Sequence, residues 1–577
     1  MIKKLAGCIR EYKKASLLTP LFMVLEVTME VIIPILMAQL IDKGIDQGDM
    51  GYIAKMGIIL AISCVMSLSF GALSGRFAAI ASAGFAKNLR HDMYYNVQNF
   101  SFSNIDKFSS ASIVTRLTTD VTNVQNSYQM IIRIAVRAPM ILIFSLAMAF
   151  TISAKLACIF LITIPILGGG LFFIVYKVHP IFEKVFRTYD KLNNVVQENL
   201  HGIRVVKSFV REDVEEKKFT DISKEIYTDF TRAEKTIAFN GPLMQFSMYL
   251  CMILISWFGA RLIVGGELTT GELMSLITYA MQILMGLMML SMVFVMIIIS
   301  EASAKRIVEI LDEQSDLTNG ANPIKEVKDG SITFENVNFS YAKRADKLCL
   351  SNVNIDIKSG ETIGIIGGTG SSKSSFVQLI PRLYDVTEGK VTVGGIDVRN
   401  YDIESLRNEV AMVLQKNVLF SGTIKENLRW GNENATDEEL IHVCKLAQAH
   451  DFVSTFPEGY ATYIEQGGTN VSGGQKQRLC IARALLKKPK ILILDDSTSA
   501  VDTKTDALIR KAFAEEIPDT TKIIIAQRIS SIEHADKIIV LDNGKVDAVG
   551  THEELLASNA IYQEVYTSQT KGGEDHE

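Results

Sequence analysis

The stretch with the clearest chemical meaning is GGTGSSKSS, residues 367–375, which is rich in glycine and serine and carries one lysine. It follows the apolar run TIGII and precedes FVQLI, so it is expected to connect a strand to a helix. Glycines let backbone N–H groups approach phosphate oxygens, and a lysine at the end of such a loop reaches the same phosphates. The predicted phosphate-binding residues are Gly367, Gly368, Thr369, Gly370, Ser371, Ser372, Lys373, Ser374 and Ser375.

Within this loop we expect Lys373 to contact the β- and γ-phosphates of a nucleotide and Ser374 to ligate Mg²⁺. One position is unusual, because Ser372 stands just before the lysine, where such loops have glycine. Its side chain would either crowd the loop or add a hydroxyl donor, and the sequence leaves both alternatives open.

A second part of the site is predicted from ILILDD, residues 491–496. Asp495 follows four apolar residues, a place suited to holding Mg²⁺ through water, although buried strands often end in aspartate. Upstream, VSGGQKQR (471–478) has a Ser-Gly-Gly-Gln turn that opens a helix, which is a second anion-binding helix N-terminus. One nucleotide does not need two phosphate cradles, so we expect a face-to-face dimer in which each turn closes over the other subunit's nucleotide.

Long apolar segments precede these motifs. A membrane helix needs about 20 largely apolar residues. The six expected spans are residues 15–41, 57–75, 138–154, 156–176, 236–260 and 273–300. The connections after the second and fourth spans are long and polar or amphipathic, so we expect the helices to continue into water there. The first 14 residues carry five lysines and arginines, whereas residues 42–52 carry only Lys43, which places the N-terminus, both long connections and the C-terminal region in the cytosol.

The pattern changes at Ser331, after which SITFENVNFSY, ETIGIIGG, ILILDD and TKIIIAQR are expected to be strands of an α/β sheet. We therefore predict a membrane-embedded all-α six-helix domain at 1–310, a linker at 311–330, an α/β phosphate-loop domain at 331–567 and a polar, disordered tail at 568–577.

Composition supports this division and excludes other classes. The chain has 577 residues, is 48% hydrophobic and has a mean hydropathy of +0.21, which is high for a soluble protein. A net charge of −5 argues against a nucleic-acid partner. The seven cysteines are scattered without a CxxC pair, so neither a disulfide framework nor a zinc site is expected.

Over its whole length the chain resembles half-transporters of the ATP-binding cassette (ABC) exporter family, in which six membrane helices precede one nucleotide-binding domain and two chains form the transporter. The resemblance implies ATP and Mg²⁺ as ligands. It implies that Tyr341 stacks on adenine, that Gln415 and Asp495 contact Mg²⁺, and that SAVD (499–502) forms the turn that crosses to the partner. The residues that match the family's signature are Ser472, Gly473, Gly474 and Gln475.

Two positions depart from the family's pattern. Asp496 stands where the catalytic glutamate is expected, and Gln527 stands where the switch histidine is expected. The aspartate carboxylate falls about 1–1.5 Å short, and a misplacement of about 1 Å can cost roughly a hundredfold in rate. Glutamine can hydrogen-bond the γ-phosphate but cannot carry a proton or a charge. We therefore expect slow hydrolysis at this chain's own site, although neutral drift in a working enzyme is the alternative.

This pattern resembles the degenerate-site subunit of heterodimeric bacterial multidrug exporters. It implies a partner half-transporter that keeps the glutamate and the histidine, a bacterial inner-membrane location, and small hydrophobic or amphipathic substrates. Two alternatives stay open: a homodimeric lipid or peptide exporter with a slow ATPase, and a mainly regulatory ATP-binding subunit. No peptidase-like segment precedes the first span, so a peptide-processing exporter is not expected.

Three features concern the transport path. Residues 102–114 and 203–212 are candidate coupling helices. Glu26 and Glu30 lie one helical turn apart, as do Arg133 and Arg137, and such charges at membrane depth either pair with each other or bind a charged substrate. A methionine stripe at helical spacing suits either a polyspecific pocket or ordinary helix packing. Its members are Met281, Met285, Met288, Met292 and Met296, with Met289 beside them.

Overall fold

The computed structural model describes residues 1–342, 347–496 and 501–574, with side chains described except at positions 186, 190, 295, 298, 299 and 571–574. The chain divides into two compact units. The first comprises Met1–Gln98 and Ser110–Glu313, and the second comprises Asn99–Ser109 and Gln314–Glu577. A short piece of the N-terminal half therefore belongs to the second unit, a division that the predicted boundary at residue 310 did not anticipate.

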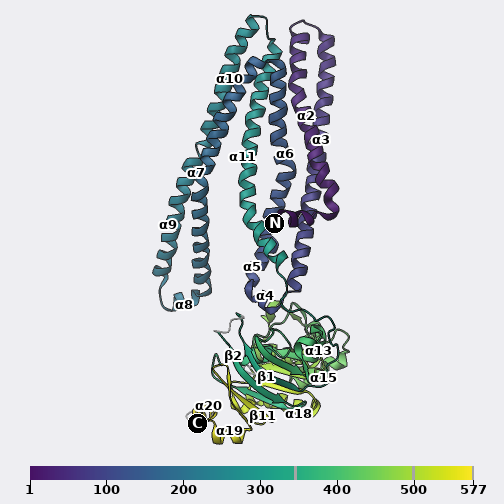
Figure 1. Ribbon diagram of the computed structural model, residues 1–577, viewed down its shortest axis with the longest axis vertical. Coiled ribbons are helices and arrows are strands. Elements are labelled where there is room, and N and C mark those ends of the chain that lie inside the picture. Colours follow the sequence, from purple (N-terminus) through teal and green to yellow (C-terminus); the bar gives the residue numbers. More distant parts are fainter. Residues whose placement is uncertain (343–346, 497–500, 575–577) are drawn as a thin grey trace. The chain divides into compact units, whose positions relative to one another are not determined.

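The first unit is built from helices. Its helices are α1 (Ile2–Gly7), α2 (Lys13–Leu40), α3 (Met50–Gln98), α5 (Ser110–Thr115), α6 (Val121–Ile152), α7 (Ala154–His201), α8 (Ile203–Ser208), α9 (Glu212–Ile237), α10 (Asn240–Val264) and α11 (Thr270–Asp312). Figure 1 shows the longer ones, such as α2, α3, α6 and α11, running side by side in nearly the same direction. Six helical stretches in the described residues are long and apolar enough to cross a membrane, and each overlaps one of the six predicted spans. The predicted number and order of spans are confirmed.

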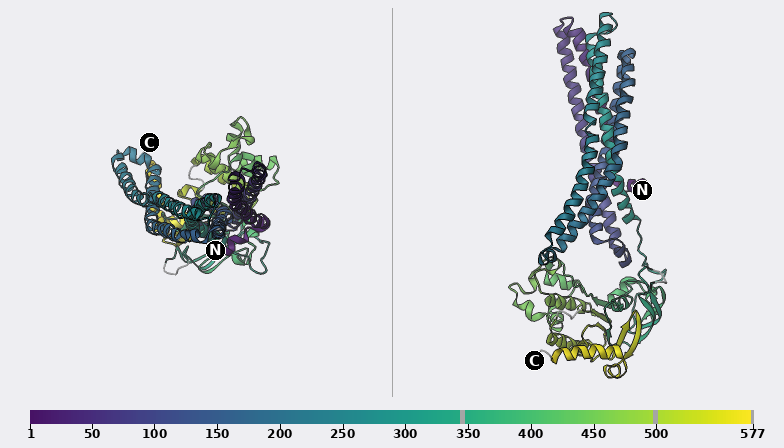
Figure 2. Two further views of the ribbon diagram at one scale, coloured as in Figure 1. Left: turned by 90° about the horizontal axis from the view of Figure 1, so that it is seen from above. Right: turned by 90° about the vertical axis from the view of Figure 1, so that its left-hand side faces the viewer.

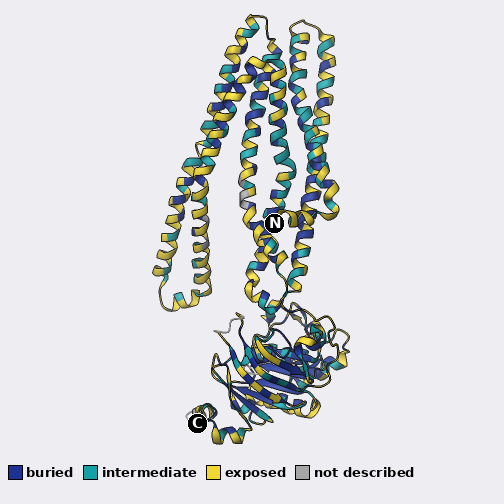
Figure 3. Cartoon of the chain, viewed as in Figure 1, coloured by how far each residue is buried: buried dark blue, intermediate teal, exposed yellow. Residues whose placement is uncertain are grey.

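Opposite faces of α2 show why this unit suits a bilayer. Met23, Val27 and Val31, spaced by one turn, are buried in an apolar core that they share with residues of α6 and α11. Leu17 and Leu21 on another face of the same helix are 72% and 54% exposed. Figure 3 shows this alternation of buried and exposed residues along the long helices. A helix that buries one apolar face and exposes another is stable when lipid surrounds it.

The long connections continue the membrane helices, as expected. Helix α3 extends to Gln98 and α7 extends to His201, well beyond the predicted spans that they contain. The first candidate coupling segment forms two short helices, α4 (Phe102–Lys107) and α5, and the second forms α8. Of these, α4 belongs to the second unit. Ser101 caps α4 and forms a capping box with Asn104, which fixes where this helix begins.

The described residues of the second unit form three sheets. Its strands are β1 (Ile332–Phe339), β2 (Leu350–Ile357), β3 (Thr362–Ile366), β4 (Glu388–Val393), β5 (Ile396–Asp397), β6 (Val410–Val413), β7 (Gly422–Thr423), β8 (Tyr463–Ile464), β9 (Ile491–Asp495), β10 (Thr521–Ile525), β11 (Lys537–Asp542) and β12 (Lys545–Gly550). The largest sheet has the order β12-β11-β3-β10-β9-β6, and its five strands from β11 to β6 are parallel. An antiparallel sheet has the order β2-β1-β4-β5, and β7 pairs with β8.

The central parallel strands are continuous apolar runs because both faces of the sheet are covered. Every residue of β9 and β10 is buried. Figure 3 shows much dark blue in the sheet region of this unit. The helices of this unit, besides α4, are α12 (Lys373–Gln378), α13 (Ile403–Glu409), α14 (Ile424–Arg429), α15 (Asp437–Leu446), α16 (His450–Thr455), α17 (Gly473–Leu485), α18 (Thr503–Glu516), α19 (His552–Ser558) and α20 (Ala560–Glu574). The predicted combination of a six-helix domain and an α/β domain is confirmed.

The end of the chain differs from expectation. The segment 568–574, predicted as part of a disordered tail, continues α20, the yellow helix that leads to the C-terminal label in Figure 2. Tyr562 on α20 is fully buried and its hydroxyl lies 2.7 Å from His552 of α19. Packing at the start of α20 therefore stabilises this helix. Its polar C-terminal end could not be predicted as helical from composition alone.

Candidate functional site

The predicted site residues come together because four neighbouring strands of the large sheet are parallel. The strands β3, β10, β9 and β6 all end at the same edge. The segments that follow them carry the predicted phosphate loop, Gln527, the acids 495–496 and Gln415, in that order. In open parallel sheets this carboxyl edge is where ligands bind.

The predicted phosphate loop (residues 367–375) follows β3 and leads into α12. A Cβ atom added at Gly367 would lie 2.1 Å from the carbonyl oxygen of Leu541, so only glycine fits there. Added Cβ atoms at Gly368 and Gly370 would meet nothing within 4 Å. The outer rim of the loop is therefore open enough to admit a phosphate group.

Lys373 holds its ammonium group against this rim. Its Nζ donates to the carbonyl oxygens of Gly367 and Gly368, both at 2.8 Å, and to Oγ of Ser371 at 3.2 Å. Burial lowers the pKa of Lys373, while the nearby charges of Asp495 and Asp496 act in the opposite direction. Among the described residues, the side chain of Lys373 therefore meets only neutral acceptors.

Ser372 adopts the backbone conformation that glycine usually provides. Its φ is 70° and its ψ is 26°, in the left-handed region. Among the described residues, its hydroxyl makes no hydrogen bond, and it does not cap α12. Crowding of the loop and donation by the hydroxyl therefore both stay predictions, and the structure adds a third feature, a backbone cost, since a non-glycine residue in this region is disfavoured by roughly 1–2 kcal/mol.

Asp495 and Ser374 form the part of the site that suits a magnesium ion. The hydroxyl of Ser374 donates to Oδ1 of Asp495 across 3.1 Å. Burial and the charge of neighbouring Asp496 raise the pKa of Asp495, against the opposing effects of Ser374 and Lys373. A buried carboxylate beside a second carboxylate is relieved by a divalent cation, and hydroxyl and carboxylate oxygens are ligands that Mg²⁺ accepts. These residues therefore fit the ion that the sequence predicts.

Asp496 is held by Gln415 and Gln527, both of which the sequence analysis assigns to the site. Its Oδ2 accepts from Nε2 of Gln527 at 2.6 Å and from Nε2 of Gln415 at 3.3 Å. Its backbone is also left-handed, with φ of 50°. We refer to Ser374, Gln415, Asp495, Asp496 and Gln527 as the acid corner. In the acid corner the carboxylate in the catalytic position is tied to neutral amide groups.

Tyr341 lies beside the loop with its side chain accessible. It is 46% exposed, and its hydroxyl lies 2.9 Å from Oγ of Ser375 and donates to Oε1 of Gln378 at 3.2 Å. The ring of Tyr384 packs edge-on against it, with centroids 5.1 Å apart. The sequence analysis did not predict that Gln378 and Tyr384 lie beside Tyr341. The signal that could have pointed to Tyr384 is its position soon after the helix that follows the phosphate loop.

The predicted signature, Ser472–Gln475, opens α17 with regular geometry. Oγ of Ser472 accepts from the backbone N–H of Gln475, and Oε1 of Gln475 accepts from the backbone N–H of Ser472. This capping box fixes the start of α17 without any other element. In the described part of the chain, no hydrogen bond joins this signature turn to the phosphate loop, so the structure does not bring the two predicted cradles together.

The predicted crossing turn, 499–502, is only partly covered. Ser499 and Ala500 lie outside the described residues. Asp502 caps α18, where Oδ1 accepts from the backbone N–H of Thr505 at 2.9 Å.

The charges at membrane depth pair with each other. Arg137 on α6 donates to Glu26 at 2.5 Å and to Glu30 at 2.8 Å, and both acids lie on α2. The Glu26 carboxyl also lies against Gly71 of α3, where an added Cβ would come within 3.1 Å. The structure thus shows the internal pairing that the sequence left as one alternative; Arg133 is half-buried one turn away.

The methionine stripe lies on an accessible face of α11. Met285, Met288 and Met292 are 56%, 49% and 60% exposed. These side chains are not filling the core of this chain, which argues against ordinary packing within the first unit.

Comparisons with known proteins agree with this architecture. Residues 17–288 match the ABC transporter transmembrane region, and residues 350–499 match the ABC transporter family that covers the ATP-binding domain. The uncharacterized ABC transporter ATP-binding protein YfiB of Bacillus subtilis is 36% identical over 568 residues, which covers 98% of each chain. The putative multidrug export ATP-binding/permease protein SAB1799c of Staphylococcus aureus is 32% identical over 99% of this chain and 100% of its own length.

A solved structure shows the same fold. The structure of a bacterial Atm1-family ABC exporter with ATP bound superposes with a TM-score of 0.82 at 23% identity, and it covers 96% of this chain and 99% of that one. Together with the six membrane-capable helices among the described residues, these matches make the chain a multi-pass membrane protein whose ATP-hydrolysing domain drives transport. The chain therefore belongs to the ABC transporter family, as a half-transporter in which the transmembrane region precedes the ATP-binding domain.

Proposed function

We propose that this chain is the degenerate-site half of a heterodimeric exporter of small hydrophobic or amphipathic compounds. The observation that carries the proposal is the acid corner, where Asp496 replaces the expected glutamate and is hydrogen-bonded by Gln527 and Gln415. The chain binds ATP at its own site, hydrolyses it slowly, and completes a faster site on a partner subunit.

In the proposed site each residue has one task. Tyr341 stacks on the adenine, and the backbone of Gly367–Ser375 surrounds the phosphates. Lys373 moves from the loop carbonyls, 2.8 Å away, to the β- and γ-phosphates, where a charged acceptor offers a stronger hydrogen bond than a neutral one. Ser374, Gln415 and Asp495 hold Mg²⁺, which neutralises phosphate charge.

Slow hydrolysis follows from the groups around Asp496. A general base or water anchor needs a free carboxylate oxygen at the right distance from the attacking water. Here one oxygen already accepts from two amide groups, and the side chain is one methylene shorter than glutamate. Gln527 cannot carry a proton, so it cannot replace the missing histidine.

The signature turn supports the heterodimer. Its local capping box is complete and its first turn carries no acidic side chain, so it presents backbone N–H groups to an anion. Since the same chain lacks the expected glutamate and histidine, a consensus site requires a second subunit that supplies both. Similar proteins of Bacillus subtilis and Staphylococcus aureus, at 29% and 32% identity, carry the words putative multidrug export in their names, which supports the proposed substrate class.

We further propose that the accessible methionines of α11 contact the transported compound. Thioether side chains adapt to varied apolar shapes, which suits polyspecific binding. The proposed topology places the N-terminus and the ATP-binding domain in the cytosol, as the distribution of basic residues predicts. The resemblance to bacterial exporters is the reason for proposing the bacterial inner membrane as the location.

The deciding experiment measures ATP turnover by the full pair in which the partner's catalytic glutamate is replaced by glutamine. The remaining turnover then comes from this chain's site, and we expect it to be at least about a hundredfold below that of the unaltered pair. A matched sample carrying Lys373→Ala defines the background. Brisk turnover in the partner variant would show that Asp496 is an adequate catalytic carboxylate, and rapid ATPase from the purified chain alone would contradict the heterodimer.

A further inference from the structure

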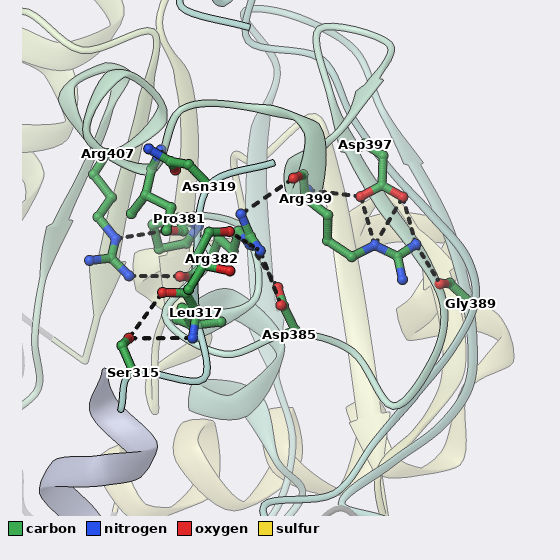
Figure 4. Close-up of polar contacts among 12 residues, drawn as sticks. Ser315, Leu317, Asn319, Pro381, Arg382, Asp385, Gly389, Asp397, Arg399 and Arg407 are labelled. Atoms are coloured by element: carbon green, nitrogen blue, oxygen red, sulfur yellow. Dashed lines mark hydrogen bonds and ion pairs between the residues drawn. The ribbon is translucent and has the colours of Figure 1, made fainter. Parts of the chain in front are cut away.

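A tight turn in the second unit gathers contacts from several parts of the chain. This junction turn, Pro381–Asp385, follows the helix that continues from the phosphate loop. Arg382 is 4% exposed with φ of 51°, and its guanidinium donates to Asp385 at 2.8 Å and 3.2 Å. Arg407 donates to the carbonyl oxygens of Pro381 and Arg382, as Figure 4 shows. The junction turn is therefore held by hydrogen bonds within itself and by the side chain of Arg407 on α13.

The same turn holds the linker that follows the last membrane helix. Nη2 of Arg382 donates to the carbonyl oxygen of Thr318 at 3.3 Å, and Figure 4 shows the linker residues Leu317 and Asn319 beside this arginine. The linker contacts α4 as well, because Nδ2 of Asn104 donates to the carbonyl oxygen of Gln314 at 3.1 Å. Two chain segments that lead to membrane helices thus reach one small region of the second unit.

Tyr384, within the junction turn, makes the direct contact with α4. Its hydroxyl donates to Oδ2 of Asp106 at 2.6 Å, and its ring meets Phe102 edge-on at 6.1 Å between centroids. Burial and this hydrogen bond to a carboxylate both raise the pKa of Tyr384, so the hydroxyl keeps its proton and remains a donor. A hydrogen bond from a neutral donor to a charged acceptor is stronger than one between neutral groups.

The ring of Tyr384 also contacts Tyr341, the residue to which we assign stacking on the adenine base. Tyr384 and Tyr341 are perpendicular, at 89° and 5.1 Å, and Phe339 contacts both rings. Because closely packed rings cannot move independently, restraint of one tyrosine restrains the other. A continuous set of contacts therefore leads from Tyr341 through Tyr384 to Asp106 on α4.

We propose that Tyr384 is a positioning residue. Through it, the degree to which α4 is ordered depends on the adenine base bound at Tyr341. This inference rests on the proposed function, which places adenine on Tyr341. When the base stacks, Tyr341 is fixed, Tyr384 loses freedom, and its hydroxyl holds Asp106 more of the time. Helix α4 then reports the presence of the base, separately from the phosphates at Lys373.

The test is hydrogen exchange followed by mass spectrometry on the full-length chain with its partner in lipid nanodiscs, with and without saturating MgATPγS. Peptides from residues 365–378 report phosphate-loop occupancy, and peptides from residues 99–109 report α4. In the unaltered chain we expect nucleotide to slow exchange in both, by about fivefold for α4.

Variants separate the contacts. Tyr384→Phe, Asp106→Ala and Tyr341→Ala should keep phosphate-loop protection at saturation but reduce the α4 effect to less than about twofold. Asp106→Asn should retain it, because the amide oxygen still accepts from the hydroxyl. Tyr460→Phe is the matched control: it also removes one half-buried hydroxyl, 3.0 Å from His450, and should behave like the unaltered chain.

Two results overturn the inference while leaving the proposed function in place. One is a protected phosphate loop with no nucleotide effect on α4 in the unaltered chain; the other is full α4 protection in Tyr384→Phe. A phosphate loop that nucleotide does not protect in the unaltered chain would instead refute the proposed ATP site and, with it, this inference.

Discussion

The phosphate loop with its acid corner and the signature turn are both proposed to face nucleotide phosphates, yet they are built differently. The first includes two non-glycine residues with left-handed backbones, Ser372 and Asp496. The signature turn has a complete capping box, and its helix starts with regular geometry. One region therefore carries a backbone cost and altered side chains, while the other satisfies its own hydrogen bonds locally.

The difference shows which contacts each region depends on. Ser472 and Gln475 are three residues apart and cap each other, so the hydrogen bonds that define the start of this helix lie within four residues. Asp496 depends on Gln527 and Gln415, which come from segments 31 and 81 residues away. A site assembled from distant segments can lose catalytic geometry while the signature remains able to serve a partner.

The largest expected effect comes from altering the signature turn. Gly474→Asp places a negative charge at the helix end proposed to face the partner's nucleotide, so turnover of the pair should fall roughly 100- to 1000-fold. Steady-state ATPase of the pair measures it.

Thr436→Ala provides the control for that experiment, because Thr436 forms an equivalent capping box with Glu439 at α15. It should lower stability by about 1 kcal/mol and leave turnover unchanged. Full activity in Gly474→Asp would mean that the signature does not act on a partner's site.

The next effect concerns the acid corner. In a pair whose partner has its catalytic glutamate replaced by glutamine, Asp496→Glu with Gln527→His should raise ATP hydrolysis roughly tenfold to a hundredfold. The double change should exceed the sum of the single changes, because Gln527 and Asp496 are in direct contact at 2.6 Å and act as a unit. Single-turnover hydrolysis measures this. Equal rates for the double variant and the parent would show that these two residues are not the cause of slow hydrolysis.

A smaller effect is expected on binding. Lys373→Ala removes the only cation that contacts the described loop carbonyls, so ATP affinity at this chain's site should fall about tenfold or more. Photolabelling of this chain with an azido-ATP analogue measures occupancy separately from the partner. Unchanged labelling would contradict the assignment of the phosphate loop.

Much of the fold could be predicted because its signals are local. Apolar runs of membrane length gave six spans, and the buried strands β9 and β10 were visible as continuous apolar runs. The carboxyl edge of parallel strands then explains why Lys373, Asp495 and Gln527 share one edge. The capping box of Ser472 is likewise a pattern within four residues.

Features that depend on distant contacts could not be predicted. The hydrogen bond between Tyr384 and Asp106 joins residues 278 apart in sequence, and nothing local marks either as a partner. The pairing of Arg137 with Glu26 and Glu30 was one of two open alternatives until the helices were placed. The helical end of α20 depends on packing near Tyr562, which composition does not reveal.

The smallest expected effect tests whether Ser372 is only a backbone cost. If the left-handed φ of 70° is its sole consequence, Ser372→Gly should relieve strain but add chain entropy to the unfolded state, so thermal stability should rise by no more than about 1 kcal/mol. ATP affinity should change less than about twofold, because the hydroxyl makes no hydrogen bond among the described residues. Ser372→Ala keeps the backbone cost and removes only the hydroxyl. A loss of ATP affinity in both variants would show that the hydroxyl donates to a phosphate, so that the loop gains a ligand contact in exchange for its backbone strain. Unchanged ATP affinity in both variants would leave the acid corner as the sole reason for slow hydrolysis at this site.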